Sequence, residues 1–410
     1  MKHRLPPALR LRPFALLWTA SLTTGVAAQM IAVAIGWQVY TLHHNPFDLG
    51  LVGLAEFGPL PLLALPAGQL ADRASRRVVA AVAGALHVCV AGTLLAITVV
   101  GPGSIWPYLG VGALAGTMSA IGSPATRALT PELVPGELLQ GAIALRNVAG
   151  QIGVVAGPAL GGVIFAVDPM AVYAAAAALL GVALAAFVAL PPTASRQLEE
   201  PANWENLVAG IRFISRTRTL LGVILLDLFG VLLGDPIALA PVFAKTILGI
   251  GPIGLGALRT APSVGALLAA FLIARKPLRW PAGPTMLVVV ASFGASTIVF
   301  GVSRWLPLSL AALFVSGFVD MVSVNIRATM LAVITPLRLQ GRVNAVEWVF
   351  ISASNELGAF EAGGMAAALG TVRAVVLGGA LMVGIAGSWR KLFPELSRVG
   401  RLEDMSPEPV

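Results

Sequence analysis

Long apolar runs, each able to cross a lipid bilayer as a helix, recur along the whole 410-residue chain. A membrane-spanning helix needs about 20 mostly apolar residues. Charged residues make up only 11% of the chain, less than half of the roughly 25% found in soluble proteins. So few charges cannot cover a water-facing surface. The sequence therefore predicts an all-α integral membrane protein.

Twelve segments qualify as spans: 14–41, 49–70, 78–100, 106–129, 138–166, 170–190, 220–246, 253–275, 283–302, 305–333, 342–368 and 371–391. Basic residues gather in alternate connections between these spans, while the remaining connections hold only Lys245, Arg304 and Arg373. Positively charged connections stay on the cytoplasmic side. The pattern therefore predicts twelve spans with both ends of the chain in the cytoplasm. The excess of arginine over lysine favours a bacterium, and hence its cytoplasmic membrane.

A polar stretch between the sixth and seventh spans divides the chain into two halves. Apolar residues recur there at helical spacing from Trp204 to Ile214, with arginines between and after them, which indicates an amphipathic helix on the cytoplasmic surface. The pair Thr130-Pro131 recurs 205 residues later as Thr335-Pro336, which suggests duplication. We expect a six-helix bundle at 1–190, a linker at 191–219, a second bundle at 220–392 and a cytoplasmic tail at 393–410.

The connection after the second span carries the most specific motif, GQLADRASRR at residues 68–77. It resembles the loop signature of the major facilitator superfamily, with Ser75 where the family usually has glycine. The surrounding sequence resembles the branch containing drug:proton antiporters and the enterobactin exporter. The resemblance covers the whole chain and implies two pseudo-symmetric six-helix bundles, the major facilitator fold.

Five residues of this loop are candidates for a gate on the cytoplasmic side: Gly68, Asp72, Arg73, Arg76 and Arg77. A glycine lets two helices approach closely, and a carboxylate at a helix end can pair with arginine or accept hydrogen bonds from a helix N-terminus. Such a cluster can latch the two halves together. The alternative is that the arginines only fix the topology.

The fifth span contains closely spaced small residues: Gly153, Gly157, Pro158, Gly161 and Gly162. They resemble part of the antiporter signature, although its upstream glycine is Ala144 here. Small residues four apart let helices touch, and proline can kink a span. The resemblance implies export. Close packing without any bearing on direction is the alternative.

Among the ionisable residues inside predicted spans we single out Glu56, Arg146, Asp227, Asp235, Arg259, Asp320, Arg327, Glu347, Glu356 and Glu361. Each costs about 2.5–3.5 kcal/mol in a lone helix, so each needs a partner or a wet cavity. From these we select Asp235, Asp227, Asp320, Arg327, Glu356, Glu361 and Glu56 as candidates for proton coupling or substrate contact. Permanent pairing between helices is the alternative.

The spacing of these candidates along the chain indicates which of them can share one face of a helix. Asp320 and Arg327 are seven residues apart, about 10 Å along one helix face, so each should meet another helix. Glu356 and Glu361 are five apart and cannot face the same point. Asp235 lies in Gly234-Asp235-Pro236, where we expect the helix to break.

These features favour a secondary transporter that uses a proton gradient to export a small amphipathic compound, drug-like or siderophore-like, by alternating access. A nutrient importer or facilitator is the second reading, and a membrane sensor or enzyme the remote third. The connections contain no catalytic cluster and no Walker loop, so we expect no enzyme, cofactor or metal site. Topology accounts for the basic residues, so no nucleic-acid partner is expected. We expect a monomer in the bilayer.

Overall fold

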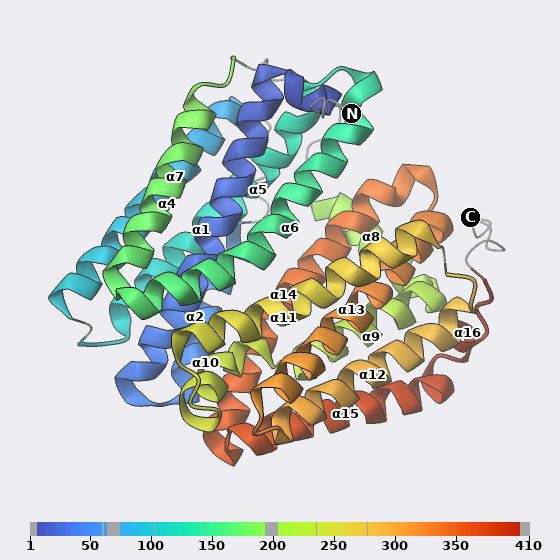
Figure 1. Ribbon diagram of the computed structural model, residues 1–410. Coiled ribbons are helices and arrows are strands. Elements are labelled where there is room, and N and C mark those ends of the chain that lie inside the picture. The colour runs from blue at the N-terminus through green and yellow to red at the C-terminus, as the bar shows by residue number, and fades with distance from the viewer. Residues whose placement is uncertain are drawn as a thin grey trace. The chain divides into compact units, whose positions relative to one another are not determined.

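The computed structural model describes residues 6–59, 61–63, 74–101, 103–192, 204–234, 236–276 and 278–401. Within these ranges every regular element is a helix (Figure 1). The elements are η1 (Pro7–Arg10), α1 (Arg12–His43), α2 (Pro46–Phe57), α4 (Arg76–Val100), α5 (Trp106–Leu133), α6 (Gly136–Val167), α7 (Pro169–Val188), α8 (Trp204–Arg216), α9 (Arg218–Gly234), η2 (Ile237–Leu239), α10 (Ala240–Val242), η3 (Phe243–Ile247), α11 (Gly251–Arg275), α12 (Ala282–Val302), α13 (Leu306–Ile334), α14 (Leu337–Leu369), α15 (Thr371–Leu392) and α16 (Pro394–Ser397).

Nine helical segments among the described residues are long and apolar enough to cross a membrane. Two further helices, α5 with 28 residues and α14 with 33, match the predicted spans 106–129 and 342–368. The predicted span 49–70 is described only in part, by α2 and a few following residues. The structure is therefore consistent with twelve spans and confirms an all-helical membrane fold.

The helix break predicted around Asp235 is present. Helix α9 ends at Gly234, and the chain continues from Pro236 through the short elements η2, α10 and η3. Proline lacks a backbone N–H and disfavours helical geometry in the residue before it. Asp235 itself lies outside the described residues, so its proposed contact with a proton stays a prediction.

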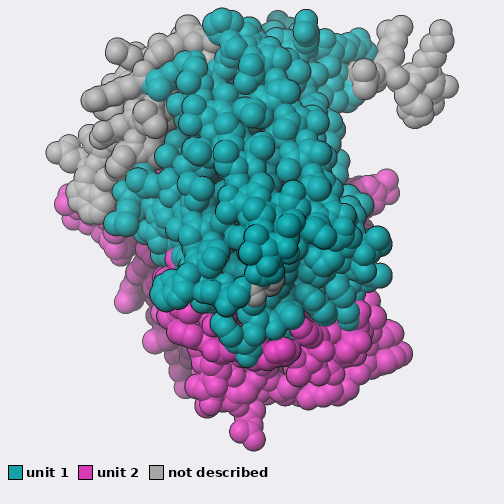
Figure 2. All heavy atoms as spheres, turned by 90° about the vertical axis from the view of Figure 1, so that its left-hand side faces the viewer, with its two compact units in different colours: residues 1–43, 55–202, 251–260 teal, residues 44–54, 203–250, 261–410 magenta. Residues whose placement is uncertain are grey.

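The chain divides into two compact units, coloured separately in Figure 2. Unit 1 comprises residues 1–43, 55–202 and 251–260, and unit 2 comprises residues 44–54, 203–250 and 261–410. Helices α2 and α11 therefore each contribute to both units. Our boundaries at 1–190 and 220–392 follow the sequence alone and stay a prediction.

Unit 1 is built around α1, which packs against α6 and α7, while α4 packs against α5 and α7. Alanine fills much of the buried face of α1, and Ala20, Ala27 and Ala34 have no exposed surface. Short side chains let neighbouring helices approach closely, which suits a bilayer, where the hydrophobic effect gives no drive for helices to associate.

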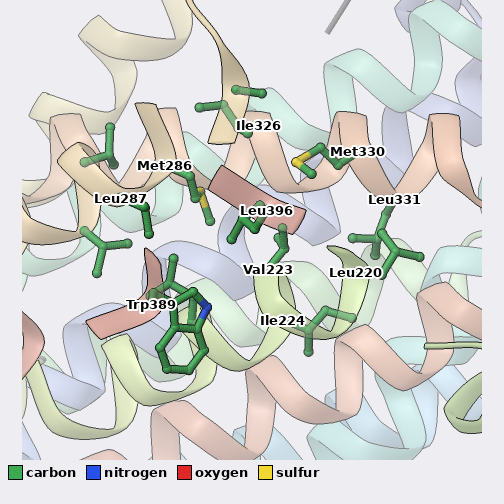
Figure 3. Close-up of a cluster of buried hydrophobic side chains, with 14 of the residues drawn as sticks. Leu220, Val223, Ile224, Met286, Leu287, Ile326, Met330, Leu331, Trp389 and Leu396 are labelled. Atoms are coloured by element: carbon green, nitrogen blue, oxygen red, sulfur yellow. The ribbon is translucent and has the colours of Figure 1, made fainter. Parts of the chain in front are cut away.

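Unit 2 has a larger apolar core, shown in Figure 3. Leu220 and Val223 of α9, Met286 of α12 and Met330 of α13 are fully buried there. Trp389 of α15 closes the core and donates its indole N–H to the Gly222 carbonyl at 2.9 Å. This bond satisfies the one polar atom of the buried indole.

The first residues of the predicted tail are part of unit 2. Leu396 of α16 is fully buried. The backbone N–H of Ala282 donates to the Gly400 carbonyl at 2.7 Å, and that of Gly283 donates to the Val399 carbonyl at 3.3 Å. These bonds pair two of the donors that a helix start leaves free. Residues 394–401 are therefore docked, and 402–410 lie outside the described residues.

The predicted amphipathic helix is α8. Its face containing Gly210 and Ile214 is buried against α14, and a Cβ atom added to Gly210 would lie 2.8 Å from the Arg342 carbonyl oxygen. Arg212 and Arg216 are exposed. The apolar side that we assigned to the membrane surface thus packs in part on a neighbouring helix.

Candidate functional site

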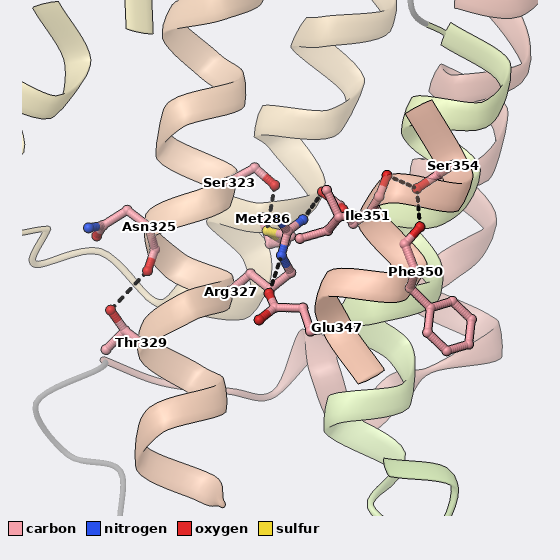
Figure 4. Close-up of polar contacts among 10 residues, drawn as sticks. Met286, Ser323, Asn325, Arg327, Thr329, Glu347, Phe350, Ile351 and Ser354 are labelled. Carbon is pink, nitrogen blue, oxygen red and sulfur yellow. Dashed lines mark hydrogen bonds and ion pairs between the residues drawn. The ribbon is translucent and has the colours of Figure 1, made fainter. Parts of the chain in front are cut away.

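A buried arginine joins three helices of unit 2. Arg327 of α13 forms ion pairs with Asp227 of α9 and Glu347 of α14. The bond from Nε of Arg327 to Oε1 of Glu347 is 3.0 Å long, and Figure 4 shows it. Only 5% of the Arg327 side chain is exposed, so the guanidinium depends on these carboxylates in place of water.

Two small hollows flank Asp227. One, of about 10 Å³, is also lined by Arg327, Glu347 and Ser354, and it has room for about one water molecule. The other, of about 20 Å³, is lined by Asp227, Asp320 and Ser323. The site therefore brings three carboxylates and one guanidinium close to water-sized spaces. We call Asp227, Asp320, Arg327 and Glu347 the charged cluster.

Arg327 and Asp320 of α13 have different neighbours. Arg327 bonds to residues of two other helices, while Asp320, seven residues earlier, lines a different hollow. Asp227 was among our candidates, but Glu347 was not selected from the ionisable residues. The available signal was that a guanidinium has five N–H donors, so a buried Arg327 needs more acceptors than one carboxylate supplies.

The other two carboxylates of α14 lie apart from this cluster and from each other. An oxygen of Glu356 lies 3.5 Å from the position that a Cβ atom on Gly53 would take. Glu361 lines a hollow of about 10 Å³ together with Pro236 and Thr297. Their different surroundings agree with the angular separation that their spacing predicts.

Unit 1 contains a separate charge pairing. Glu56 of α2 interacts electrostatically with Arg259 of α11. Arg259 also donates from Nη1 to the Ala32 carbonyl of α1 at 3.4 Å. The backbone of Glu56 lies against Gly116 of α5, where a side chain would collide with the Glu56 carbonyl. Glu56 thus lies against α5 and interacts with the arginine of α11.

The described part of the candidate gate loop ties helices of one unit together. Arg76 is buried and pairs with Glu132 at the end of α5. Arg77 donates to the Val188 carbonyl at the end of α7 at 2.5 Å. Nothing in the loop sequence pointed to Glu132, which is 56 residues away. The remaining candidates, Gly68, Asp72 and Arg73, lie outside the described residues, so the latch stays a prediction.

The small residues of the fifth span make close helix contacts in unit 1. The side of α6 with Gly153, Gly157 and Gly161 faces α1, where a Cβ atom on Gly153 would lie 2.8 Å from the Gly25 carbonyl carbon. A Cβ atom on Gly162 would lie 2.6 Å from the Pro252 carbonyl oxygen of α11. Pro158 is buried inside the same helix. This geometry accounts for the motif by packing and does not bear on direction.

A neutral hydrogen-bond network lies at one end of unit 1. Oε1 of Gln38 accepts from the hydroxyl groups of Tyr108 at 3.1 Å and Tyr173 at 2.7 Å. The Gln38 amide nitrogen donates to Thr98 at 3.0 Å. Four helices therefore share one satisfied polar network. We call Gln38, Thr98, Tyr108 and Tyr173 the neutral network.

Solved transporter structures share this fold. A bacterial homologue of the human lysosomal transporter Spinster, in an inward-facing and unoccupied conformation, aligns with a TM-score of 0.78 at 14% identity, covering 98% of this chain and 99% of that one. A D-xylose–proton symporter aligns with a TM-score of 0.67 at 15% identity, covering 94% and 98%. The fold is thus that of major facilitator transporters.

Sequence comparison identifies the family within this class of transporters. The chain belongs to the major facilitator family described as transmembrane secretion effectors, whose model matches residues 5–405. It is 27% identical over 368 residues to the enterobactin exporter EntS of Shigella boydii serotype 18 and to that of Escherichia coli O139:H28, covering 88% of this chain and 87% of each relative. The chain is a multi-pass membrane transporter and not an enzyme.

Proposed function

We propose that the protein is a proton-driven exporter that moves a small amphipathic, siderophore-like compound out of a bacterial cell by alternating access. The observation that carries the coupling is the charged cluster, in which two partly buried carboxylates, Asp227 and Glu347, pair with the buried guanidinium of Arg327. The family membership and the relatives named as enterobactin exporters support export of a siderophore-like or drug-like solute.

The charged cluster suits proton coupling because two carboxylates, Asp227 and Glu347, pair with the single positive charge of Arg327. A surplus of negative charge is costly in a low-dielectric interior, and binding of a proton relieves it. Arg327 bridges α9, α13 and α14. Neutralising one of its partners weakens one arm of that bridge and frees the helices to shift. A proton taken up from outside thereby drives a change of shape.

We further propose an orientation in the membrane, a cytoplasmic gate and an energy source. Both chain ends lie in the cytoplasm, the latch formed by the loop after the second span closes that side, and the protein works as a monomer without a cofactor. The proton gradient supplies the energy.

Complementation in cells tests export. The chain is expressed in a strain that lacks its multidrug pumps and its own enterobactin exporter, and enterobactin in the medium and tolerance to a drug panel are measured. We expect siderophore release or drug tolerance to rise. If neither changes while the protein is present in the membrane, the exporter proposal fails.

Reconstitution tests coupling. Proteoliposomes carrying the transported compound are given a pH gradient, and wild type is compared with Asp227→Asn and Glu347→Gln. We expect both variants to lose uphill transport but to keep exchange of labelled for unlabelled compound. Glu395→Gln, which changes a carboxylate on α16 remote in sequence from the charged cluster, is the control. Uphill transport by Asp227→Asn at the wild-type rate would refute the assignment.

A further inference from the structure

One side of α11 exposes an apolar stripe along the second half of the helix. Leu267, Leu268, Phe271 and Leu272 are each 41–51% exposed, and residues three and four apart lie on the same side of a helix. The stripe ends at Arg275, the last residue of α11, whose guanidinium carbon lies 4.2 Å from the centre of the Phe271 ring. Such a contact between a cation and an aromatic ring is attractive. In a bilayer, exposed apolar side chains of this kind contact the acyl chains of lipids.

Basic residues cluster where this stripe ends. Arg275, Lys276 and Arg279 are all exposed, and no ion pair joins any of them to a carboxylate among the residues that the structure describes. Trp280, the next residue, is 70% exposed. Tryptophan favours the boundary between the acyl chains and water, which indicates that these positive charges lie at the level of the lipid headgroups.

The docked chain end brings further positive charge to the connection between α11 and α12. The backbone bond from Ala282 to Gly400 places Arg401, which is exposed, beside the start of α12. Glu395, the carboxylate of α16, pairs with Arg218 at 3.1 Å. The docked segment thus adds a positive charge here, while its carboxylate already has a basic partner on α9.

We propose that the basic end of α11 and the apolar stripe bind one anionic phospholipid. The phosphate lies among Arg275, Lys276 and Arg279, which we call the headgroup site, and the acyl chains follow the stripe. Arginine binds phosphate with two parallel hydrogen bonds, and lysine adds a point charge. A soluble anion needs only the charges, whereas a charged site continuous with an apolar stripe fits a molecule with both a head and long tails. This lipid site does not depend on which solute is transported or in which direction.

Native mass spectrometry of the full chain tests the headgroup site. Dioleoylphosphatidylglycerol, which is anionic, or dioleoylphosphatidylcholine, which has the same acyl chains but no net charge, is titrated onto the protein in detergent, and bound lipids are counted. We expect Arg275→Gln/Lys276→Gln/Arg279→Gln to bind phosphatidylglycerol about tenfold or more weakly than wild type, because each basic residue near a lipid surface adds to the attraction. Binding of phosphatidylcholine should change little.

Two further variants separate this site from surface charge in general. Arg212→Gln/Arg216→Gln/Arg338→Gln removes the same number of charges at exposed positions of α8 and α14, and it should keep most of the phosphatidylglycerol binding. Arg275→Lys/Arg279→Lys retains the charges of the headgroup site and should recover much of the binding, even if the glutamine variant is less stable. Equal loss in both glutamine variants, or no loss in the first, would overturn the site.

Fluorescence quenching locates the bound lipid. Phosphatidylglycerol or phosphatidylcholine, brominated on the acyl chains close to the headgroup, is added to the protein, and the emission of Trp280 is obtained as the difference between wild type and Trp280→Phe. We expect the anionic lipid to quench this emission more strongly, and the excess to disappear in the triple glutamine variant of the headgroup site. Equal quenching by the two lipids would contradict the proposal.

The acidic end of the chain is the competing occupant. Residues 402–410 lie outside the described residues and contain Glu403, Asp404 and Glu408. In the full chain, Glu403→Gln/Asp404→Asn/Glu408→Gln should leave the difference between wild type and the triple glutamine variant of the headgroup site unchanged. If that difference arises only after these carboxylates are neutralised, the chain end covers the basic residues, and the assignment to lipid is overturned.

Discussion

Unit 1 and unit 2 both bury polar side chains, but they satisfy them in different ways. In unit 1 the neutral network matches donors to acceptors, and Arg76 pairs with a single carboxylate. In unit 2 one guanidinium serves two paired carboxylates, with a third along the same helix. A balanced network has one stable state, whereas an unbalanced one changes when a proton arrives. Under the proton coupling proposed above, the charged cluster of unit 2 is the part that switches, and the neutral network of unit 1 holds its helices rigid.

The largest expected effect comes from removing the centre of the charged cluster. Arg327→Met leaves Asp227 and Glu347 buried without their partner, which should lower the free energy of unfolding by about 3–5 kcal/mol. Denaturant unfolding of the purified protein in detergent measures this. Adding Asp227→Asn and Glu347→Gln to Arg327→Met should restore most of the loss. If the triple variant is no more stable than the single one, the charges are not the cause.

Disrupting the neutral network should lower the free energy of unfolding by a smaller amount, and by the same amount at each pH. Gln38→Leu removes the acceptor of two buried tyrosine hydroxyls, which should cost about 1–3 kcal/mol. Because neither glutamine nor threonine titrates, the loss should be the same at pH 5 and pH 8. Thermal unfolding at both values checks this. A loss that varied with pH would show that a titrating group takes part in the neutral network.

One closely packed glycine in each unit allows the packing of the two units to be compared by alanine substitution. Gly116 of α5 faces the Glu56 carbonyl of α2, and Gly317 of α13 faces the Pro262 carbonyl of α11, each too close for a side chain. Alanine at either site should cost at least about 1 kcal/mol. We further expect Gly317→Ala to slow transport more, since its helix carries Arg327. If the two alanine variants are equally stable and transport at equal rates, the conformational switch is not confined to unit 2.

The smallest effect concerns the exposed ion pair between Arg218 and Glu395 at 3.1 Å. A backbone hydrogen bond at Glu395 itself, and then Arg218, hold the pKa of this carboxyl below its ordinary value of 4.5. Its stabilising effect is therefore present above that value and is lost as the pH falls through the lower folded-state pKa. Hydrogen exchange in α16 should rise in Arg218→Ala at pH 7 but differ little from wild type at pH 3. A difference that persists at pH 3 would contradict this origin.

The helical fold and its spans were predictable because lipid leaves only a few ways to satisfy a backbone. Apolar length and charged connections located α1, α4 and α6 to within a few residues. The break after Gly234 was also predictable from the proline two residues later. In each case a local property of the sequence decides the outcome.

The partners of the polar residues were less predictable. Arg327 was recognised as needing another helix, but its choice of Asp227 and Glu347 depends on how α9, α13 and α14 are rotated against one another. These rotations depend on the angles between helices, which no periodicity in the sequence encodes.

The docked chain end has a consequence for how the protein is made. The first two N–H groups of α12 bond to the carbonyls of Gly400 and Val399, which the ribosome adds more than a hundred residues later. Until then this helix start has no such acceptors, and the groove that Leu396 fills is empty. Unit 2 therefore cannot be completed until residues 396–400 have been synthesised. A premature stop before Leu396 should leave an incompletely folded protein that cellular proteases recognise.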